Sequence, residues 1–220
     1  MESIKIDETL MIPPGRHTLP PDKVEERQRE RLVRAMVACV GRQGYKETTI
    51  ADVVAVAHTS RTAFYENFAD KQDCFLEAYR QMTAGFIGAS LQAAEQVGDW
   101  RGKLDAGIAT YYQWMADHPE VAVSTVVEVH SAGRRALEAR SVALEQWTRT
   151  LKGVGVLARR AGADVEPSNA AYDAIVLTAE AHVHDYARRG CVERVAERAP
   201  EAQALARSLF GCDAPSARAA

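Results

Sequence analysis

Apolar residues recur along the chain at intervals of three or four positions, which is the period of an α-helix and not of a β-strand. A first helix is expected to begin at Asp22, with Glu25 completing its cap, and to end at Gly44. Its apolar stripe consists of Leu32, Met36, Cys39 and Val40. No segment alternates as a strand does and no internal repeat occurs, so the pattern predicts an all-α protein.

The same period continues through the rest of the chain. From Asp70 it is sustained for about 25 residues, which predicts a single helix roughly 40 Å long. Gly85 and Gly88 lie inside this helix and are expected bending points, because glycine weakens a helix interior. Further helices are expected at about 100–115, from Pro119 to near Gly133, at about 137–157, from Ser168 or Asn169 to Gly190, and from about Pro200 to Phe210.

Three helix starts are packed into the segment 48–71, which carries the clearest functional signal in the chain. Thr49 followed by Asp52 forms a capping box before a short apolar run. After a break of two residues Ser60 can cap a second short helix, and Asp70 can cap the long helix that follows. The segment therefore predicts a helix-turn-helix motif.

In a helix-turn-helix motif the first residues of the second helix enter the major groove of DNA. Here these residues are Arg61, Thr62 and Ala63. A guanidinium can bind guanine through two hydrogen bonds, and the two methyl groups can contact the methyl group of thymine. Tyr65 and Asn67 lie one turn further along and are expected to reach phosphates.

Lys71 stands in the first turn of the third helix, whose amide-rich start suits a phosphate. The full set of expected DNA contacts is Thr48, Thr49, Ser60, Arg61, Thr62, Ala63, Tyr65, Asn67 and Lys71. The alternative is that the two short helices belong to an ordinary helical core, packed through Phe64 and Phe68. Inward packing of these two rings is compatible with both interpretations.

The chain resembles TetR-type bacterial transcriptional regulators in two adjacent runs, T-T-I-A-D-V-V at 48–54 and S-R-T-A-F-Y-E-N-F-A-D-K at 60–71. The resemblance extends over about 31–79. It implies an all-helical homodimer with a ligand-binding C-terminal domain, which binds a near-palindromic operator and releases it when a small molecule binds. His58 departs from the family, in which this turn usually contains glycine, but histidine enters left-handed conformations more readily than most residues.

Composition and charge restrict the class of protein. The chain has 220 residues, of which 47% are hydrophobic and 26% charged, as is typical of a soluble globular protein with a real core. A net charge of −3 argues against a nonspecific nucleic-acid coat. The four cysteines form no C-x-x-C pair and no apolar run approaches the length of a membrane span, so a reducing cytoplasm is the expected location and no membrane association is expected.

The expected organisation has four parts. They are a flexible N-terminal arm at 1–21, a three-helix DNA-binding domain at 22–79, a helical ligand-binding and dimerisation domain at 80–213, and a loose tail at 214–220. The arm contains four prolines and no helical period. Its Arg16 and His17 can reach a minor groove, although a plain flexible tail is the favoured interpretation.

A largely apolar ligand, aromatic or lipid-like, is expected inside the C-terminal domain. The reason is that bulky apolar side chains and a few polar tips fall on three helices that must face one another. These side chains are Met82, Phe86, Tyr111, Trp114, Met115, His118 and Trp147. Ordinary core packing is the alternative for each of them taken singly. A tilt of the long helix at Gly85 or Gly88 is expected to carry the signal to the reading helices.

A two-fold dimer is expected, because one short reading helix covers too few base pairs and paired half-sites follow from symmetry. The expected interface is the apolar face of the helix that ends at Gly190. It consists of Tyr172, Ile175, Val176, Ala179, His182, Val183 and Tyr186. Packing of this face inside the monomer is the alternative.

Other kinds of chemistry have little support. His182 and His184 point to different sides of a helix and cannot both bind one ion, so no metal site and no cofactor are predicted. No catalytic or nucleotide-binding motif occurs, and the protein is not expected to be an enzyme. The sequence favours a DNA-binding transcriptional repressor released by an apolar ligand. The alternative is a constitutive DNA-binding protein without a small-molecule effector.

Overall fold

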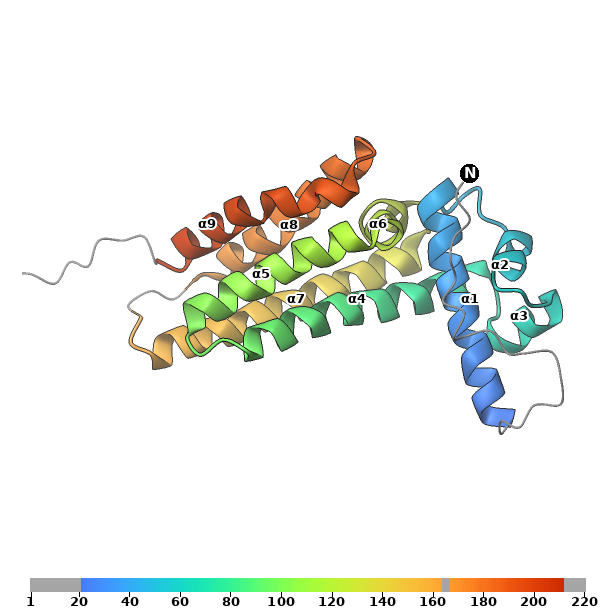
Figure 1. Cartoon of the computed structure of the whole chain (residues 1–220), viewed down its shortest axis with the longest axis horizontal. Coiled ribbons are helices and arrows are strands. Elements are labelled where there is room, and N and C mark those ends of the chain that lie inside the picture. The colour runs from blue at the N-terminus through green and yellow to red at the C-terminus, as the bar shows by residue number, and fades with distance from the viewer. Residues whose placement is uncertain (1–20, 164–166, 212–220) are drawn as a thin grey trace, which may run out of the picture.

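The computed structural model describes residues 21–163 and 167–211, and within these ranges every regular element is helical (Figure 1). The α-helices are α1 (Pro21–Gln43), α2 (Ile50–Val56), α3 (Arg61–Asn67), α4 (Lys71–Glu95), α5 (Trp100–Asp117), α6 (Pro119–Ala122), α7 (Arg134–Arg160), α8 (Asn169–Arg188) and α9 (Ala199–Leu209). A π-helical segment η2 (Val123–Val127) and two 3-10 segments, η3 (Glu128–Ser131) and η4 (Val192–Arg198), complete the order. The predicted all-α class is confirmed. Most of the expected N-terminal arm, with Arg16 and His17, and the whole expected tail lie outside the described residues.

Local capping creates the small helical domain at one end of the molecule (Figure 1). The hydroxyl of Thr49 accepts the Asp52 N–H at 3.2 Å, and the Asp52 carboxylate accepts the Thr49 N–H at 2.8 Å, which completes the predicted capping box. Ser60 accepts the Ala63 N–H at 3.1 Å and so starts α3. Asp70 caps α4 in the same way. These three predicted helix starts are confirmed.

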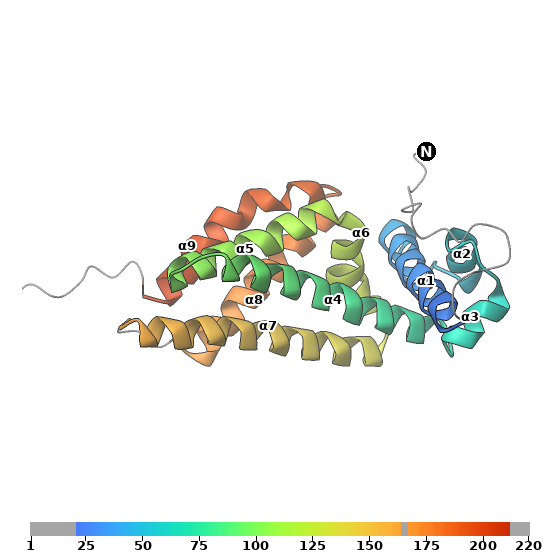
Figure 2. The same cartoon turned by 60° about the horizontal axis from the view of Figure 1, so that its bottom comes forward.

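The long helices form an elongated bundle beside this domain. α4 leaves the small domain and runs along the bundle, and α7 lies alongside it in both views (Figures 1 and 2). α5 packs against α4, α9 packs against α5, and α8 packs against α7 and α9. The bundle places the far end of α4 well away from α2 and α3.

Two groups of buried side chains make up the interior. The larger group fills the bundle and includes Leu104, Tyr112 and Val183. The smaller group lies under α1 to α4, and it also takes in Val121 and Val129 from the C-terminal part of the chain. Segment 119–131 therefore packs directly on the N-terminal helices, which fixes one domain against the other.

Segment 119–131 differs from its prediction. One helix was expected from Pro119 to Gly133, whereas the segment passes from α6 into η2 and then η3. The run is rich in β-branched residues, which crowd a regular helix, and the Thr125 hydroxyl donates to the Val121 carbonyl at 2.8 Å. The 3-10 segment η4 also carried no sequence signal that we recognised.

Candidate functional site

The helix-turn-helix motif is formed by α2 and α3. His58 lies in the turn between them with φ +49°, in the left-handed region, as its position in place of glycine predicted. From α1, the Gln28 amide donates to the Thr59 hydroxyl at 3.0 Å, which holds this turn against the supporting helix. The two short helices are thus fixed relative to each other and to α1.

The exposed face of α3 carries the side chains best placed to read DNA. Arg61 and Thr62 are exposed at its start, and Tyr65 is 58% exposed one turn later. Ala63, by contrast, is only 6% exposed and packs inward, so its expected contact with a thymine methyl group is not accessible. The side-chain amide of Asn67 donates to the Ala63 carbonyl of the same helix at 2.8 Å.

Thr48 and Lys71 have structural roles that the sequence did not predict. Thr48 is buried, and its hydroxyl donates to the Gly44 carbonyl at 2.8 Å. The Lys71 ammonium turns inward and donates to the carbonyls of Tyr45 and Thr48, each at 2.9 Å, while lying 4.2 Å from the centre of the Tyr45 ring. Burial lowers the pKa of Lys71. Two of its three donors are engaged within the domain, so a phosphate contact by Lys71 remains a prediction.

Arg29 of α1 is a positioning residue for the reading helix. Its guanidinium donates to the Asn67 carbonyl at 2.8 Å, at the end of α3, and stacks 4.4 Å from the centre of the Phe68 ring. It also pairs with Glu77 of α4 at 3.6 Å. In the sequence, Arg29 belongs to a run of interleaved charges, which indicates a mostly solvated helix face with phosphate contacts near its start as the alternative.

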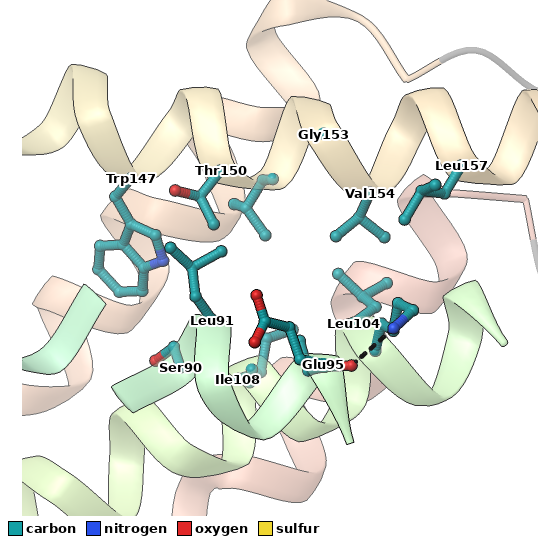
Figure 3. A pocket seen from close by; sticks show the side chains of 14 residues that line it. Ser90, Leu91, Glu95, Leu104, Ile108, Trp147, Thr150, Gly153, Val154 and Leu157 are labelled. Atoms are coloured by element: carbon teal, nitrogen blue, oxygen red, sulfur yellow. Dashed lines mark hydrogen bonds between the residues drawn. The ribbon is translucent and has the colours of Figure 1, made fainter. Parts of the chain in front are cut away.

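A cavity of about 340 Å³ opens in the bundle between α4, α5 and α7 (Figure 3). Its walls are mainly aliphatic, with Trp147 at one end, and its lining is Ser90, Leu91, Ala94, Glu95, Lys103, Leu104, Gly107, Ile108, Trp147, Thr150, Leu151, Gly153, Val154 and Leu157. The Lys103 ammonium donates to the Ala94 carbonyl at 2.8 Å, and Glu95 also lines the cavity. The cavity therefore combines an apolar interior with one acidic and one basic group.

The residues expected to line a pocket are distributed differently. Four of the expected residues do meet, namely Phe86, Tyr111, Met115 and Trp147. Their side chains fill the space between them and leave a void of only about 20 Å³. Of the seven expected residues, Trp147 is the one that also lines the cavity of about 340 Å³ between α4, α5 and α7, called the large cavity below to distinguish it from this void.

The other three expected pocket residues lie apart from the large cavity. Trp114 stacks on the exposed His118, with 4.4 Å between the ring centres. Met82 packs against the N-terminal core. Whether any of the seven residues binds a ligand remains a prediction.

The face of α8 that was expected to form the dimer interface is buried inside the chain. Tyr172, Ile175, Val176, Ala179 and Val183 all belong to the bundle core, with exposed fractions between 0% and 6%. His182 and Tyr186 also face inward, against Tyr112 and the core respectively. The apolar stripe packs within the chain, which was the alternative interpretation, and so this face is not available to a second copy.

His182 joins three helical elements through its two ring nitrogens. Nε2 lies 2.9 Å from an Arg198 nitrogen, and Nδ1 lies 2.6 Å from the Tyr112 hydroxyl. Arginine can only donate, so Nε2 must be the acceptor and Nδ1–H donates to Tyr112. Burial first, and the Arg198 charge second, lower the pKa of His182. The neutral imidazole is therefore part of the packed structure.

The candidate metal ligands do not assemble. Glu180 and His184 share one face of α8, but Glu180 accepts a hydrogen bond from Arg140 of α7. Burial raises the pKa of Glu180 despite this positive neighbour. Within 21–163 and 167–211, no three side chains of His, Cys, Asp or Glu are grouped as metal ligands. In the same ranges no helix is both long enough and apolar enough to cross a membrane.

Comparison with known proteins agrees with this geometry. Residues 32–78, which include α2, α3 and the start of α4, match the family model described as bacterial regulatory proteins, tetR family. No relative was found among curated protein sequences.

Several solved structures share the fold over most of this chain. The fatty acid degradation regulator FadR from Bacillus halodurans superposes with a TM-score of 0.74 at 16% identity, covering 83% of this chain and 97% of that one. FadR from Bacillus subtilis in complex with stearoyl-CoA gives 0.72 at 14% identity, covering 80% and 96%. A TetR family transcription regulator from Marinobacter aquaeolei VT8 gives 0.68 at 17% identity, covering 86% and 97%. Residues 32–78 therefore match the tetR family of bacterial regulatory proteins, and the chain shares the fold of TetR-type transcription regulators over most of its length.

Proposed function

We propose that the protein is a homodimeric repressor that binds a near-palindromic operator and releases it when an apolar small molecule enters the cavity between α4, α5 and α7. The observation that carries the proposal is that one helix joins the two sites. The start of α4 contacts the turn that precedes α2 through Lys71, and its last turns carry Leu91 and Glu95 into the cavity wall. A ligand that displaces the end of α4 therefore acts on an element of the reading domain.

The composition of the cavity supports an apolar ligand with a narrow body. Leu91 and Leu157 are 44% and 39% exposed at the cavity, and exposed aliphatic side chains of this size favour an apolar partner. A volume of about 340 Å³ holds roughly eleven water-sized groups of about 30 Å³ each. FadR of Bacillus subtilis was crystallised with stearoyl-CoA. For this chain we propose an acyl chain of roughly ten to twelve carbons as the best fit.

The homodimer requires a surface other than the one expected from the sequence. The outward side of α8 carries Ala170, Ala174, Leu177 and Ala181 at successive intervals of four, three and four residues. This is the spacing of a helix–helix seam, and Leu177 is 50% exposed in its middle. We expect wild-type protein to be a dimer in light scattering and Leu177→Glu to be a monomer. Leu137→Glu, at an exposed leucine of α7, is the matched control and should remain dimeric.

The effector proposal is tested by a titration in which the chain length of the probe is varied. The operator is first selected from random-sequence duplexes with purified protein. Fatty acids and acyl-CoA thioesters from octanoyl to stearoyl are then titrated while tryptophan fluorescence and operator affinity are followed. A hundredfold loss of operator affinity requires about 2.7 kcal/mol of coupling between the two sites. We expect this loss to be largest for decanoyl and dodecanoyl probes.

Two outcomes would reject parts of the proposal. Probes that quench tryptophan without changing operator affinity would reject the coupling, because the ligand would then have no preference between the two DNA-binding states. If no probe binds, the constitutive DNA-binding protein becomes the better description. A failure to select any operator would reject sequence-specific repression itself.

A further inference from the structure

We infer that Glu128 is the positioning residue through which the C-terminal domain sets the place of the DNA-reading helices. The side chain lies at the start of η3, in the segment that packs on α1. Where it concerns operator affinity, the inference rests on the proposed function. The contact that Glu128 makes is testable without DNA.

The inference begins with the turn between α1 and α2, residues 44–48. The Tyr45 N–H donates to the Glu128 carboxylate at 2.7 Å. On the other side of the same residue, the Tyr45 carbonyl accepts from the Lys71 ammonium. The backbone N–H of Tyr45 is therefore bonded to the C-terminal domain, and its backbone carbonyl is bonded to α4 of its own domain.

Glycine at position 44 makes this contact possible. Gly44 has φ +83°, which favours glycine, and it ends α1 as predicted. A Cβ atom at this position would lie 3.3 Å from the Glu128 carboxylate oxygen. The carboxylate thus lies close to the turn, and a larger residue at position 44 would both strain the backbone and push the carboxylate away.

The turn determines where α2 starts. Thr48 bonds back to Gly44 through both its N–H and its hydroxyl, at 3.2 Å and 2.8 Å. The next residue, Thr49, is the cap of α2. The Tyr45 ring packs edge-on against Phe75 of α4, with 5.0 Å between the ring centres. A displacement of the turn must therefore displace the start of α2, and α3 follows after a turn of few residues.

The location of Glu128 links this turn to the ligand domain. Thr125 and Val126, which lie just before it in the π-helical segment η2, line the small void of about 20 Å³. Trp147 lines both this void and the large cavity. π-Helical segments are rare and often occur at functional sites. Packed side chains thus connect the cavity to the segment that carries Glu128.

Three single variants of the full-length chain test the inference. Glu128→Met keeps the length of the side chain and removes both acceptor oxygens, whereas Glu128→Gln is equally uncharged but keeps one acceptor. Glu120→Met removes the same charge from an exposed position of the same segment. The comparison of Met with Gln at position 128 isolates the hydrogen bond from the charge. Glu128→Ala is a second replacement if methionine does not fit the site.

The first measurement is hydrogen exchange of the Tyr45 amide, followed by NMR. In Glu128→Met this amide should exchange about tenfold faster or more than in wild type, because its charged acceptor is lost. Glu128→Gln and Glu120→Met should remain within about threefold of wild type. Unchanged exchange in Glu128→Met, while the variant is folded, would overturn the inference.

The second measurement is affinity for an operator selected with wild-type protein, taken well below the thermal unfolding midpoint of each variant. Glu128→Met should bind about tenfold more weakly, and Glu128→Gln should restore most of the affinity. A purely structural role would lower the thermal midpoint and leave the operator affinity of folded protein unchanged. Faster Tyr45 exchange with wild-type operator affinity would therefore reject the positioning role. If wild type selects no operator, the proposed function fails, and Tyr45 exchange still decides the contact.

Discussion

Replacing Gly153 with leucine should occupy about a third of the cavity between α4, α5 and α7 and stabilise the protein. Gly153 lines the cavity, and a Cβ atom added there meets no other atom within 4 Å. Removing glycine from a helix interior contributes up to about 1 kcal/mol. The four side-chain carbons of leucine would add about 3 kcal/mol if fully buried, at about 0.8 kcal/mol each. Because position 153 is exposed, about half of that term is expected, and lost rotamer freedom offsets about 0.5 kcal/mol.

Gly88→Leu is the matched control for this substitution. Gly88 also lies inside a long helix and also has open space around its Cβ position, but it does not line the cavity. Both variants gain helix propensity, so Gly153→Leu should exceed Gly88→Leu by about 1 kcal/mol, or about 2 to 4 °C in the thermal midpoint. Decanoyl and dodecanoyl probes should bind Gly153→Leu more weakly than Gly88→Leu, because the leucine takes part of the volume that they need. Equal midpoints together with undiminished probe binding by Gly153→Leu would refute the assignment of the cavity.

Four further substitutions test the reading motif and the bundle. His58→Gly should raise the free energy of unfolding by about 1 kcal/mol, since it relieves a left-handed histidine, and thermal unfolding would detect it; a lower midpoint would contradict this. Arg61→Ala should relax base preference at one operator position at a cost of about 1 to 3 kcal/mol, and equal losses on operator and random duplex would reject base reading. Lys71→Ala should weaken binding to both duplexes alike and flatten the salt slope by about one. It should also lower the thermal midpoint, because two carbonyls lose their donor. His182 has a pKa below its ordinary 6.5 in the folded protein, so the unfolded chain binds protons more readily and stability should fall as the pH drops below about 6.5. His182→Gln should reduce this dependence in midpoints measured between about pH 8 and about pH 5, and an unchanged slope would show that other groups cause it.

The sequence predicted the reading domain well because its signals are local. Thr49, Ser60 and Asp70 each satisfy backbone amides within three residues, so the chemistry of the cap is visible in the sequence itself. The left-handed turn at His58 followed from the position of one residue. The exposure of Arg61, Thr62 and Tyr65 on α3 also followed, whereas Ala63 is buried, because one position along a helix decides between burial and exposure.

The bundle was predicted less well because its outcomes depend on long-range packing. The stripe that contains Val176 and Val183 is apolar in either interpretation, and the sequence cannot state whether the chain or a second copy covers it. Phe86 and Tyr111 were expected around a pocket, but large rings also fill the space that they enclose. The cavity between α4, α5 and α7 depends on how three helices pack, so no single residue in the sequence predicts it. Glu128 likewise acts on Tyr45, more than eighty positions earlier in the chain, and left no motif.

The arrangement of α4 and α7 has a mechanical consequence. The two helices are joined near their N-termini, where the Gln72 amide of α4 donates to the Ala132 carbonyl at 2.6 Å just before α7 begins, and the cavity lies between them towards the opposite ends. The two helices can therefore act as levers about this contact. A ligand between their C-terminal ends lies about 37 Å from the contact, because 25 helical residues span that length. Spreading these ends by about 2 Å turns a helix by only roughly 3°. A bound molecule that spreads the C-terminal ends would therefore reach the reading domain as a small change in the direction of α4.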